Sequence, residues 1–254
     1  MDATDSGLEV RRDGGVLRVT LNRPERRNAF DAALIGHLTD AFDDVGDARC
    51  VVLAGEGPSF CAGADVEWQR SAVDLSYEEN ADDAMRLYRM LEAIDSCPAP
   101  VVARVQGYAL AGGSGLVACA DMAIASPDGV FGFSEVRLGI IPAVISPFVL
   151  ARIGTAAARR YFLTGERFDA ATALRIGLVH EIAEDLDAAV DAVCTSLLAG
   201  GPEAVRAAKR LVRAQPTGLE LGEIAAARRV SAEGQEGLRA FLEKRRPAWD
   251  SAGE

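Results

Sequence analysis

The segment GYALAGGSGLVACAD, residues 107–121, consists mainly of small residues. Four glycines and four alanines surround its single serine, Ser114, so most positions offer bare backbone. Glycine permits another backbone or a ligand to approach closely. The segment follows PVVARVQG (100–107), an apolar run that is typical of a strand buried on both faces. We therefore expect a helix that starts soon after a buried strand, with unhindered N–H groups in its first turn.

Strands and helices are expected on both sides of this segment. LEVRRDGGVLRVTLN (8–22) alternates apolar and polar residues around a Gly-Gly pair, which predicts a hairpin. Asp31 is placed to cap a helix with apolar residues at helical spacing, and CVVLAGEG (50–57) predicts another buried strand. The remaining expected elements are a helix over about 78–95, strands in DMAIAS (121–126) and LVHEIA (178–183), and mainly helices from Ser146 onward. This order indicates an α/β fold with a helical C-terminal third.

Length and composition exclude several classes of protein. With 254 residues, about half of them apolar, the chain can bury a substantial core. Its net charge of −11 argues against broad binding to nucleic acid, which needs a clustered basic face. Five cysteines without a Cys-x-x-Cys pair and only two histidines predict neither a disulfide framework nor a metal site. No secretory signal or apolar run of about 20 residues is visible, so we expect a cytoplasmic protein that does not enter membranes.

The glycine segment also matches a dinucleotide-binding fingerprint on paper. Gly113, Gly115 and Ala118 have the spacing G-x-G-x-x-A, and an acid, Glu135, follows twenty residues after Gly115. That fingerprint belongs in the turn directly after the first strand of a βαβ unit. Here the glycines follow a later strand, and QGYALA (106–111) intervenes. This context argues against a nicotinamide site.

A phosphate-binding loop and a serine nucleophile are disfavoured as well. No Lys-Ser or Lys-Thr pair follows the glycines, as a phosphate loop requires. Leu116 stands where a G-x-S-x-G turn around Ser114 needs its second glycine. The two histidines, His37 and His180, lie in amphipathic or apolar stretches and are expected to be structural.

Free N–H groups at a helix start suit an anion or a developing oxyanion, although a tight packing turn would have the same sequence. A second stretch of small residues, SFCAGADV (59–66), follows the strand expected in CVVLAGEG. Two such loops at the ends of neighbouring strands could aim two N–H donors at one carbonyl oxygen. That is the geometry of an oxyanion hole.

Five segments of the chain resemble those of the crotonase superfamily, the enoyl-CoA hydratases and isomerases. They are VTLNRPERRNAF (19–30), FCAGADV (60–66), GYALAGGSGLVACADMAIAS (107–126), FGFSEVRLGIIPA (131–143) and FLEKRRPAW (241–249), in the family's order. The resemblance implies an α/β fold of the crotonase type, a spiral of ββα units over residues 1–190. It further implies a helical C-terminal trimerisation region over 191–254, and assembly as a homotrimer or as a hexamer of two trimers.

The resemblance also implies an acyl-CoA substrate whose thioester carbonyl lies between the backbone N–H groups of Ala64 and Gly112. Hydratases of the family use two glutamates. The second matches Glu135, whereas the position of the first is Gly115. Coenzyme A is part of the substrate, so neither a separate cofactor nor a metal is expected.

Further contacts to the substrate or its CoA are expected at Ala62, Asp65, Gly113, Gly115, Phe241, Lys244 and Arg26. By resemblance, Phe241 and Lys244 lie near the CoA of a neighbouring subunit, and Lys244 contacts a phosphate. Arg26 or Arg27 can add to this basic patch.

The resemblance leaves three activities open. One carboxylate beside an enolate site is sufficient to move a proton between the α and γ carbons, as in 3-enoyl to 2-enoyl isomerases. Hydration also needs a positioned water, for which Glu67 and Asp121 are minor candidates. SEVRLGIIPAVISPFVLARIG (134–154) is similar to methylglutaconyl-CoA hydratases, so an enoyl-CoA hydratase ranks first, an isomerase second and a non-catalytic acyl-CoA binder third.

Two details bear on the role of Glu135. Its neighbours in FGFSEVRLGI (131–140) are mainly apolar, so desolvation is expected to raise its pKa and to favour proton exchange near neutral pH. Dienoyl isomerases and aryl-CoA dehalogenases of the family carry an aspartate eight residues later, where this chain has Ala143. Those two chemistries are therefore disfavoured.

Overall fold

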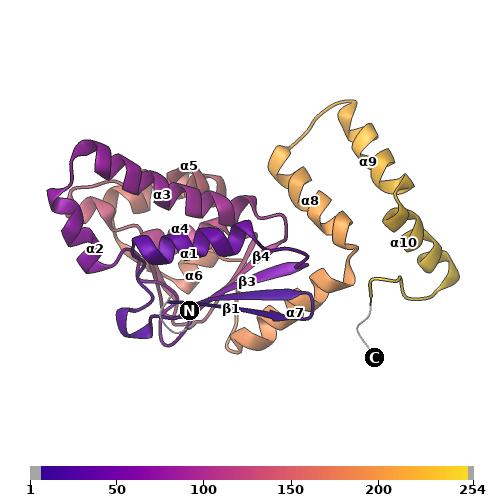
Figure 1. Ribbon diagram of the computed structural model, residues 1–254, viewed down its shortest axis with the longest axis horizontal. Coiled ribbons are helices and arrows are strands. Elements are labelled where there is room, and N and C mark those ends of the chain that lie inside the picture. Colours follow the sequence, from indigo (N-terminus) through magenta and orange to yellow (C-terminus); the bar gives the residue numbers. More distant parts are fainter. Residues whose placement is uncertain (1–6, 251–254) are drawn as a thin grey trace.

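The computed structural model describes residues 7–250 and contains two β-sheets covered by helices (Figure 1). The larger sheet has six strands in the order β1-β2-β3-β4-β6-β9. These strands are β1 (Leu8–Asp13), β2 (Val16–Leu21), β3 (Cys50–Gly55), β4 (Val101–Val105), β6 (Met122–Ala125) and β9 (Glu181–Ile182). β1 runs antiparallel to β2, and the other pairs of this sheet are parallel. The predicted hairpin and the α/β fold are confirmed.

Helices cover both faces of the larger sheet, with α1 and α3 on one face and α7 on the other (Figure 1). The α-helices of the described chain are α1 (Ala32–Asp43), α2 (Val66–Ser71), α3 (Tyr77–Ser96), α4 (Gly112–Cys119), α5 (Ser146–Thr164), α6 (Ala170–Arg175), α7 (Leu186–Ala199), α8 (Pro202–Ala214), α9 (Glu220–Val230) and α10 (Ala232–Glu243). Three short 3-10 helices are η1 (Pro24–Arg26), η2 (Ala72–Asp74) and η3 (Glu135–Leu138).

Strand β3 shows why its sequence is apolar throughout. Val51 and Leu53 pack into the larger core, which the sheet forms with α1, α3, α4 and α5. Cys50 and Val52 point to the opposite face and pack into a smaller core under α7. Successive side chains of a strand alternate between faces, so a strand covered on both sides needs apolar residues at every position.

The start of α1 follows from its capping residue. The carboxylate of Asp31 accepts a hydrogen bond from the backbone N–H of Leu34 at 3.0 Å. Leu34, Leu38 and Phe42 recur at helical spacing and are buried in the core. Both features agree with the sequence-based prediction.

The smaller sheet was not predicted, and it holds the glycine segment in place. It has three strands in the order β5-β7-β8, namely β5 (Tyr108–Leu110), β7 (Val130–Gly132) and β8 (Arg167–Asp169). Three-residue strands are too short for an alternating pattern to be recognised, and the predicted strand in 178–183 is likewise reduced to the two residues of β9. Residues 106–111, which the sequence suggested were only an interruption, therefore contain strand β5.

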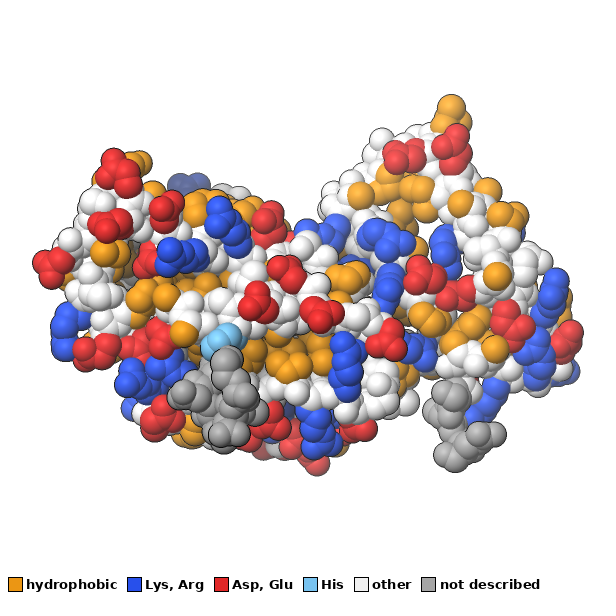
Figure 2. Space-filling model, in the orientation of Figure 1, with side chains coloured by type: hydrophobic (Ala, Val, Ile, Leu, Met, Phe, Trp, Pro, Cys, Tyr) orange, Lys and Arg blue, Asp and Glu red, His pale blue; other side chains and the backbone are white. Residues whose placement is uncertain are grey.

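The C-terminal helices α8, α9 and α10 extend away from the sheet as an arm (Figure 1). Large apolar side chains stand exposed on α9, α10 and the loop before them, among charged ones (Figure 2). The helical C-terminal region expected from the sequence is present, and its expected boundary at residue 190 falls inside α7. No helix within residues 7–250 is long and apolar enough to cross a membrane.

Candidate active site

The loop at residues 59–66 lies beside β5, so the two stretches of small residues are neighbours. The backbone N–H of Cys61 donates to the carbonyl of Tyr108 at 2.9 Å. In turn, the N–H of Leu110 donates to the carbonyl of Cys61 at 3.0 Å. These two bonds place Gly63, two residues after Cys61, next to Ala111, which follows β5.

The amides of Ala64 and Gly112 lie close together as a result. Gly63 has a positive φ of 94°, and a Cβ atom at Gly63 would lie only 3.7 Å from the amide nitrogen of Gly112. The amide nitrogen of Ala64 is bonded to the carbonyl carbon of Gly63 and is therefore close to this contact. The same Cβ would stand 2.9 Å from the carbonyl oxygen of Leu110, so only glycine fits at position 63.

Neither amide has a hydrogen-bond partner within residues 7–250, whereas one amide beside each of them does. Asp65 N–H donates to the carbonyl of Phe30, and Ala111 N–H donates to the carbonyl of Gly132. Gly112 is the first residue of α4, where an N–H has no partner inside the helix. Two unpaired N–H donors therefore stand side by side at the positive end of a helix, an arrangement that attracts an oxyanion.

Ala111, which precedes the second donor, has a strained backbone. Its φ of 49° and ψ of −117° belong to a region that glycine normally adopts. Such a conformation costs about 1–3 kcal/mol and persists only where the surroundings hold it. Here the hydrogen bond from its N–H to Gly132, at 2.8 Å, helps to fix the direction of the next amide.

Bare backbone is required at the next two positions by close packing. A Cβ at Gly112 would lie 2.3 Å from the ring of Phe30, and a Cβ at Gly113 would lie 2.2 Å from the carbonyl oxygen of Cys61. Real Cβ atoms are not found at such distances. The glycines therefore let α4 start directly against the 59–66 loop.

Ser114 connects this helix start to the segment that carries Glu135. Its fully buried hydroxyl donates to the carbonyl of Ala109 at 2.6 Å and accepts from the N–H of Gly132 at 3.3 Å. Gly132 ends β7, three residues before Glu135. Both bonds of the hydroxyl hold the fold together, which agrees with the sequence-based argument against a serine nucleophile.

Glu135 is a half-buried carboxylate, and one of its oxygens has no partner. Its Oε2 atom is buried and makes no hydrogen bond within the described chain. Burial raises the pKa of Glu135 above the ordinary value of 4.5, as the sequence predicted. Glu135 forms no ion pair with the nearby Arg137 within residues 7–250, and desolvation is the largest cause of its raised pKa. A desolvated carboxyl group with a free oxygen is suited to proton transfer.

Gly115, where related hydratases carry a glutamate, is fully buried in α4. A Cβ there would lie 2.7 Å from Cγ2 of Ile145, the residue that precedes α5. Sequence reasoning could not identify this contact, because the two residues are far apart in the chain and neither belongs to a recognisable motif.

Arg26 and Asp65 lie beside the donor loop. A guanidinium nitrogen of Arg26 is 2.8 Å from Oδ2 of Asp65, while Oδ1 of Asp65 accepts from the N–H of Glu67 and caps α2. Ala62 donates its N–H to the carbonyl of Arg27. The structure therefore brings Arg26, Ala62 and Asp65 to the same edge as the donor of Ala64.

Phe241 and Lys244 are not brought to this edge within one chain. They lie in and directly after α10, at the far end of the arm from α2 and α4 (Figure 1). The Phe241 side chain is 80% exposed, and Lys244 ends the helix with a positive φ of 53°. Contact between these residues and the CoA of the same chain is therefore not supported.

The two minor carboxylate candidates have structural partners. Glu67 is exposed and pairs with Arg70 at 2.8 Å. Asp121 accepts from the N–H of Val101 at 2.7 Å and from Lys209 at 2.6 Å. Lys209, which the sequence analysis did not single out, is one of the few buried charged side chains.

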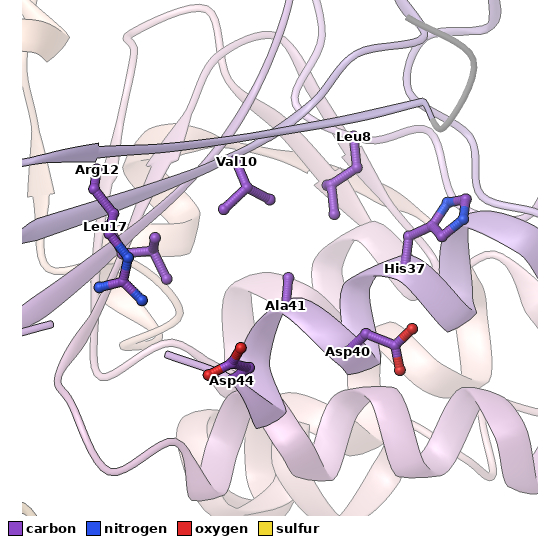
Figure 3. Close-up of a pocket in the computed structure, with 8 residues that line it drawn as sticks. All are labelled: Leu8, Val10, Arg12, Leu17, His37, Asp40, Ala41 and Asp44. Atoms are coloured by element: carbon purple, nitrogen blue, oxygen red, sulfur yellow. The ribbon is translucent and has the colours of Figure 1, made fainter. Parts of the chain in front are cut away.

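Other features of the described chain lie away from this edge. A cavity of about 450 Å³ lies between β1, β2 and α1. The residues that line it are Leu8, Val10, Arg12, Leu17, His37, Asp40, Ala41 and Asp44 (Figure 3). None of these residues belongs to the two donor loops. Within residues 7–250 there is also no cluster of three His, Cys, Asp or Glu side chains that could hold a metal ion.

Comparison with known proteins gives consistent matches over nearly the whole chain. The sequence model of the enoyl-CoA hydratase/isomerase family matches residues 11–252. An enoyl-CoA hydratase from Shewanella pealeana ATCC 700345 has a crystal structure with 40% identity and a TM-score of 0.91, covering 96% of each chain. The structure of Pseudomonas aeruginosa AtuE has 38% identity and a TM-score of 0.91, covering 96% of this chain and 99% of AtuE.

A further relative from Alternaria alternata, named enoyl-CoA hydratase ACTT6, is 32% identical over 219 residues. The match covers 84% of this chain and 72% of that protein. The fold thus matches crotonase structures, and the likeness to methylglutaconyl-CoA hydratases finds no specific support among these matches. From the family match and these relatives together, the chain belongs to the enoyl-CoA hydratase/isomerase family.

Proposed function

We propose that this protein is an enoyl-CoA hydratase that adds water to a 2-enoyl-CoA with Glu135 as its proton-transfer group. The observation that carries the proposal is the buried, unpartnered oxygen of Glu135 on a segment held against the start of α4. There the unpaired amides of Ala64 and Gly112 are free to donate hydrogen bonds to a thioester oxygen. One such donor typically contributes about 3 kcal/mol to stabilising an oxyanion.

One carboxylate is sufficient for this reaction if it first removes a proton from water and then returns a proton to the substrate. One oxygen of Glu135 takes a proton from water while the water oxygen forms a bond to the β carbon. The electron pair of the double bond moves toward the thioester, whose oxygen is stabilised by the two amides. The carboxyl group then returns a proton to the α carbon, so one water is added and Glu135 is unchanged.

The proposal includes assembly with other copies of the chain. The exposed Phe241 and the adjacent Lys244 would contact the CoA bound by a neighbouring subunit, in a homotrimer or a hexamer of two trimers. The Lys244 ammonium would act as a point charge for a CoA phosphate, with Arg26 at the edge of the donor loop. Exposed apolar side chains on the arm suit burial against another subunit.

A 3-enoyl to 2-enoyl isomerase is the second candidate, because no carboxylate stands at Gly115 to hold a water molecule. In that reaction Glu135 removes a proton from the α carbon and returns it to the γ carbon. The same two amides would stabilise the intermediate enolate, so the site itself does not distinguish the reactions.

Product mass separates the candidates. Purified protein is incubated with short 2-enoyl-CoA and 3-enoyl-CoA substrates, and products are identified by mass spectrometry. A gain of one water supports the hydratase, and an isomerised product of unchanged mass supports the isomerase. The matched variants Glu135→Gln and Glu67→Gln test the assignment of the acid. Turnover should be lost in the first and kept in the second, whereas tight binding without any conversion by the unaltered protein would contradict both candidates.

A further inference from the structure

Gly115 faces the apolar side chains of Ile145 and Leu91. The nearest atoms to a Cβ built at Gly115 are Cγ2 and Cβ of Ile145, at 2.7 and 3.2 Å, and Cδ2 of Leu91, at 3.7 Å. Ile145 is 2% exposed and Leu91 is 0% exposed. The space that a side chain at position 115 would need is therefore already filled by α3 and by the residue before α5.

These two apolar side chains lie beside the candidate site. Gly112 and Gly115 are three residues apart in α4, so they lie on the same face of the helix. Gly112 contributes the second oxyanion donor, and Ile145 reaches this face from the loop that follows η3, the 3-10 helix that begins at Glu135. The N–H of Ile140 returns to the carbonyl of Glu135 at 3.3 Å and tightens that loop.

Ile145 cannot easily move aside. Its side chain is branched at Cβ, and such side chains have few accessible rotamers. One of the two close atoms is Cβ itself, which is fixed by the backbone. A carboxylate placed at 115 would also be desolvated among apolar atoms without a partner, which is costly.

We propose that Ile145 is a specificity-determining residue, which occupies the space of a second carboxylate and so restricts the site to proton transfer through Glu135 alone. This inference rests on the proposed function of Glu135. It makes Gly115 and Ile145 a matched pair. Ile145 fills the volume that the missing side chain leaves, and water is not held from this side of the substrate.

A thermodynamic cycle tests the contact itself. Gly115→Ala is made in the unaltered chain and in an Ile145→Ala background, and melting temperatures are compared. We expect Gly115→Ala to lower the melting temperature by several degrees beside isoleucine and by clearly less beside alanine, which removes Cγ2 at 2.7 Å and keeps the Cβ at 3.2 Å. Gly36→Ala on α1, where a Cβ meets nothing within 4 Å, is the matched control and should show no loss in either background. An equal loss from Gly115→Ala in both backgrounds would overturn the inference.

An activity experiment tests the specificity. Gly115→Glu alone is compared with the double variant Gly115→Glu, Ile145→Gly, using a short 2-enoyl-CoA. The double variant should hydrate this substrate at least about tenfold faster in kcat/KM than the single variant. It should also show an additional ionisation in the pH profile of kcat/KM that the unaltered enzyme lacks.

The inference is wrong if Gly115→Glu melts as the unaltered protein does and matches the double variant in rate. It is equally wrong if the folded double variant keeps the pH profile of the unaltered enzyme. Should the double variant not fold, the thermodynamic cycle decides. Full turnover in Glu135→Gln would refute the proposed function and leave the coupling between 115 and 145 unchanged, so the two failures are distinguishable.

Discussion

The polar groups at the two ends of α4 differ in whether they have hydrogen-bond partners. At its C-terminal end, the carboxylate of Asp121 accepts from Lys209 and from the N–H of Val101, while its carbonyl accepts from Arg152 at 3.2 Å. At its N-terminal end, the amides of Ala64 and Gly112 and one oxygen of Glu135 have no partner in the described chain. Buried polar groups are almost always paired, because an unpaired one destabilises the fold.

This difference indicates that one end of this short helix serves stability and the other end serves the candidate site. The paired end stabilises the junction of α3, α4, α5 and α8. The unpaired polar groups at the N-terminal end lower the stability of the fold. Their presence is explained if a bound thioester, through its oxygen and its reacting carbons, occupies the space beside them. The following predictions change one end at a time, and the largest expected effect comes first.

Replacing Glu135 with Gln should have the largest effect, on catalysis. The variant keeps its shape but cannot exchange a proton, so kcat should fall by about 10³-fold, equivalent to about 4 kcal/mol. Steady-state kinetics with the substrate identified by product mass measure the loss. Because the amides are untouched, the affinity for an unreactive acyl-CoA should remain within about threefold; a loss of less than tenfold in kcat would remove Glu135 from the mechanism.

Replacing Asp121 with Ala should affect stability instead. Among the described residues, the buried ammonium of Lys209 then keeps only the carbonyl of Ala99, at 3.1 Å, and the N–H of Val101 loses its acceptor. Breaking a buried pair of this kind typically costs about 3 kcal/mol, and urea unfolding of the variant measures the loss. The kcat of the folded fraction should not change by more than about twofold. A large fall in kcat at unchanged stability would show that Asp121 takes part in the chemistry.

The pH dependence of stability should reveal the burial of Glu135. Its folded-state pKa is raised by desolvation, so the folded protein holds this proton more tightly than the unfolded chain. Burial of the group therefore destabilises the fold progressively as pH rises from the ordinary pKa of 4.5 through the raised value.

Thermal melting of the unaltered protein and of Glu135→Gln from about pH 4 to about pH 8 measures this effect. Relative to the Gln variant, the unaltered protein should lose a few degrees as pH rises, and the change should level off above the raised pKa. A constant difference across this range would mean that Glu135 is not desolvated.

Replacing Ala111 with Gly should have the smallest effect. Glycine adopts the φ of 49° and ψ of −117° at this position without strain, so stability should rise by up to about 1 kcal/mol. The gain is measured by urea unfolding, with Ala32→Gly at the exposed start of α1 as a control that should lose stability. A destabilised Ala111→Gly protein would show that the observed conformation carries no strain.

Much of the fold could be predicted from local patterns. The hairpin of β1 and β2, the cap at Asp31 and the buried strand β3 depend on residues close together in sequence, which spacing and turn chemistry reveal. The apolar surroundings of Glu135 were visible for the same reason. The smaller sheet was missed because its strands have three residues each, too few to show a period.

Long-range packing explains what could not be predicted at the site. The two donor loops could be proposed from their glycines, but their contact depends on the pairing of Cys61 with β5. Lys209 and Asp121 are 88 residues apart, and no motif joins them. The match between Gly115 and Ile145 is a matter of filled volume, which appears only when α4 and α5 are packed.

A crystal structure of the Glu135→Gln variant with a bound 2-enoyl-CoA would show whether the two amides bind the thioester. We expect the thioester oxygen within about 3 Å of the amide nitrogens of both Ala64 and Gly112, with the double bond beside residue 135. A thioester oxygen bound elsewhere, or those two amides engaged by the protein's own carbonyl groups while substrate is present, would contradict it.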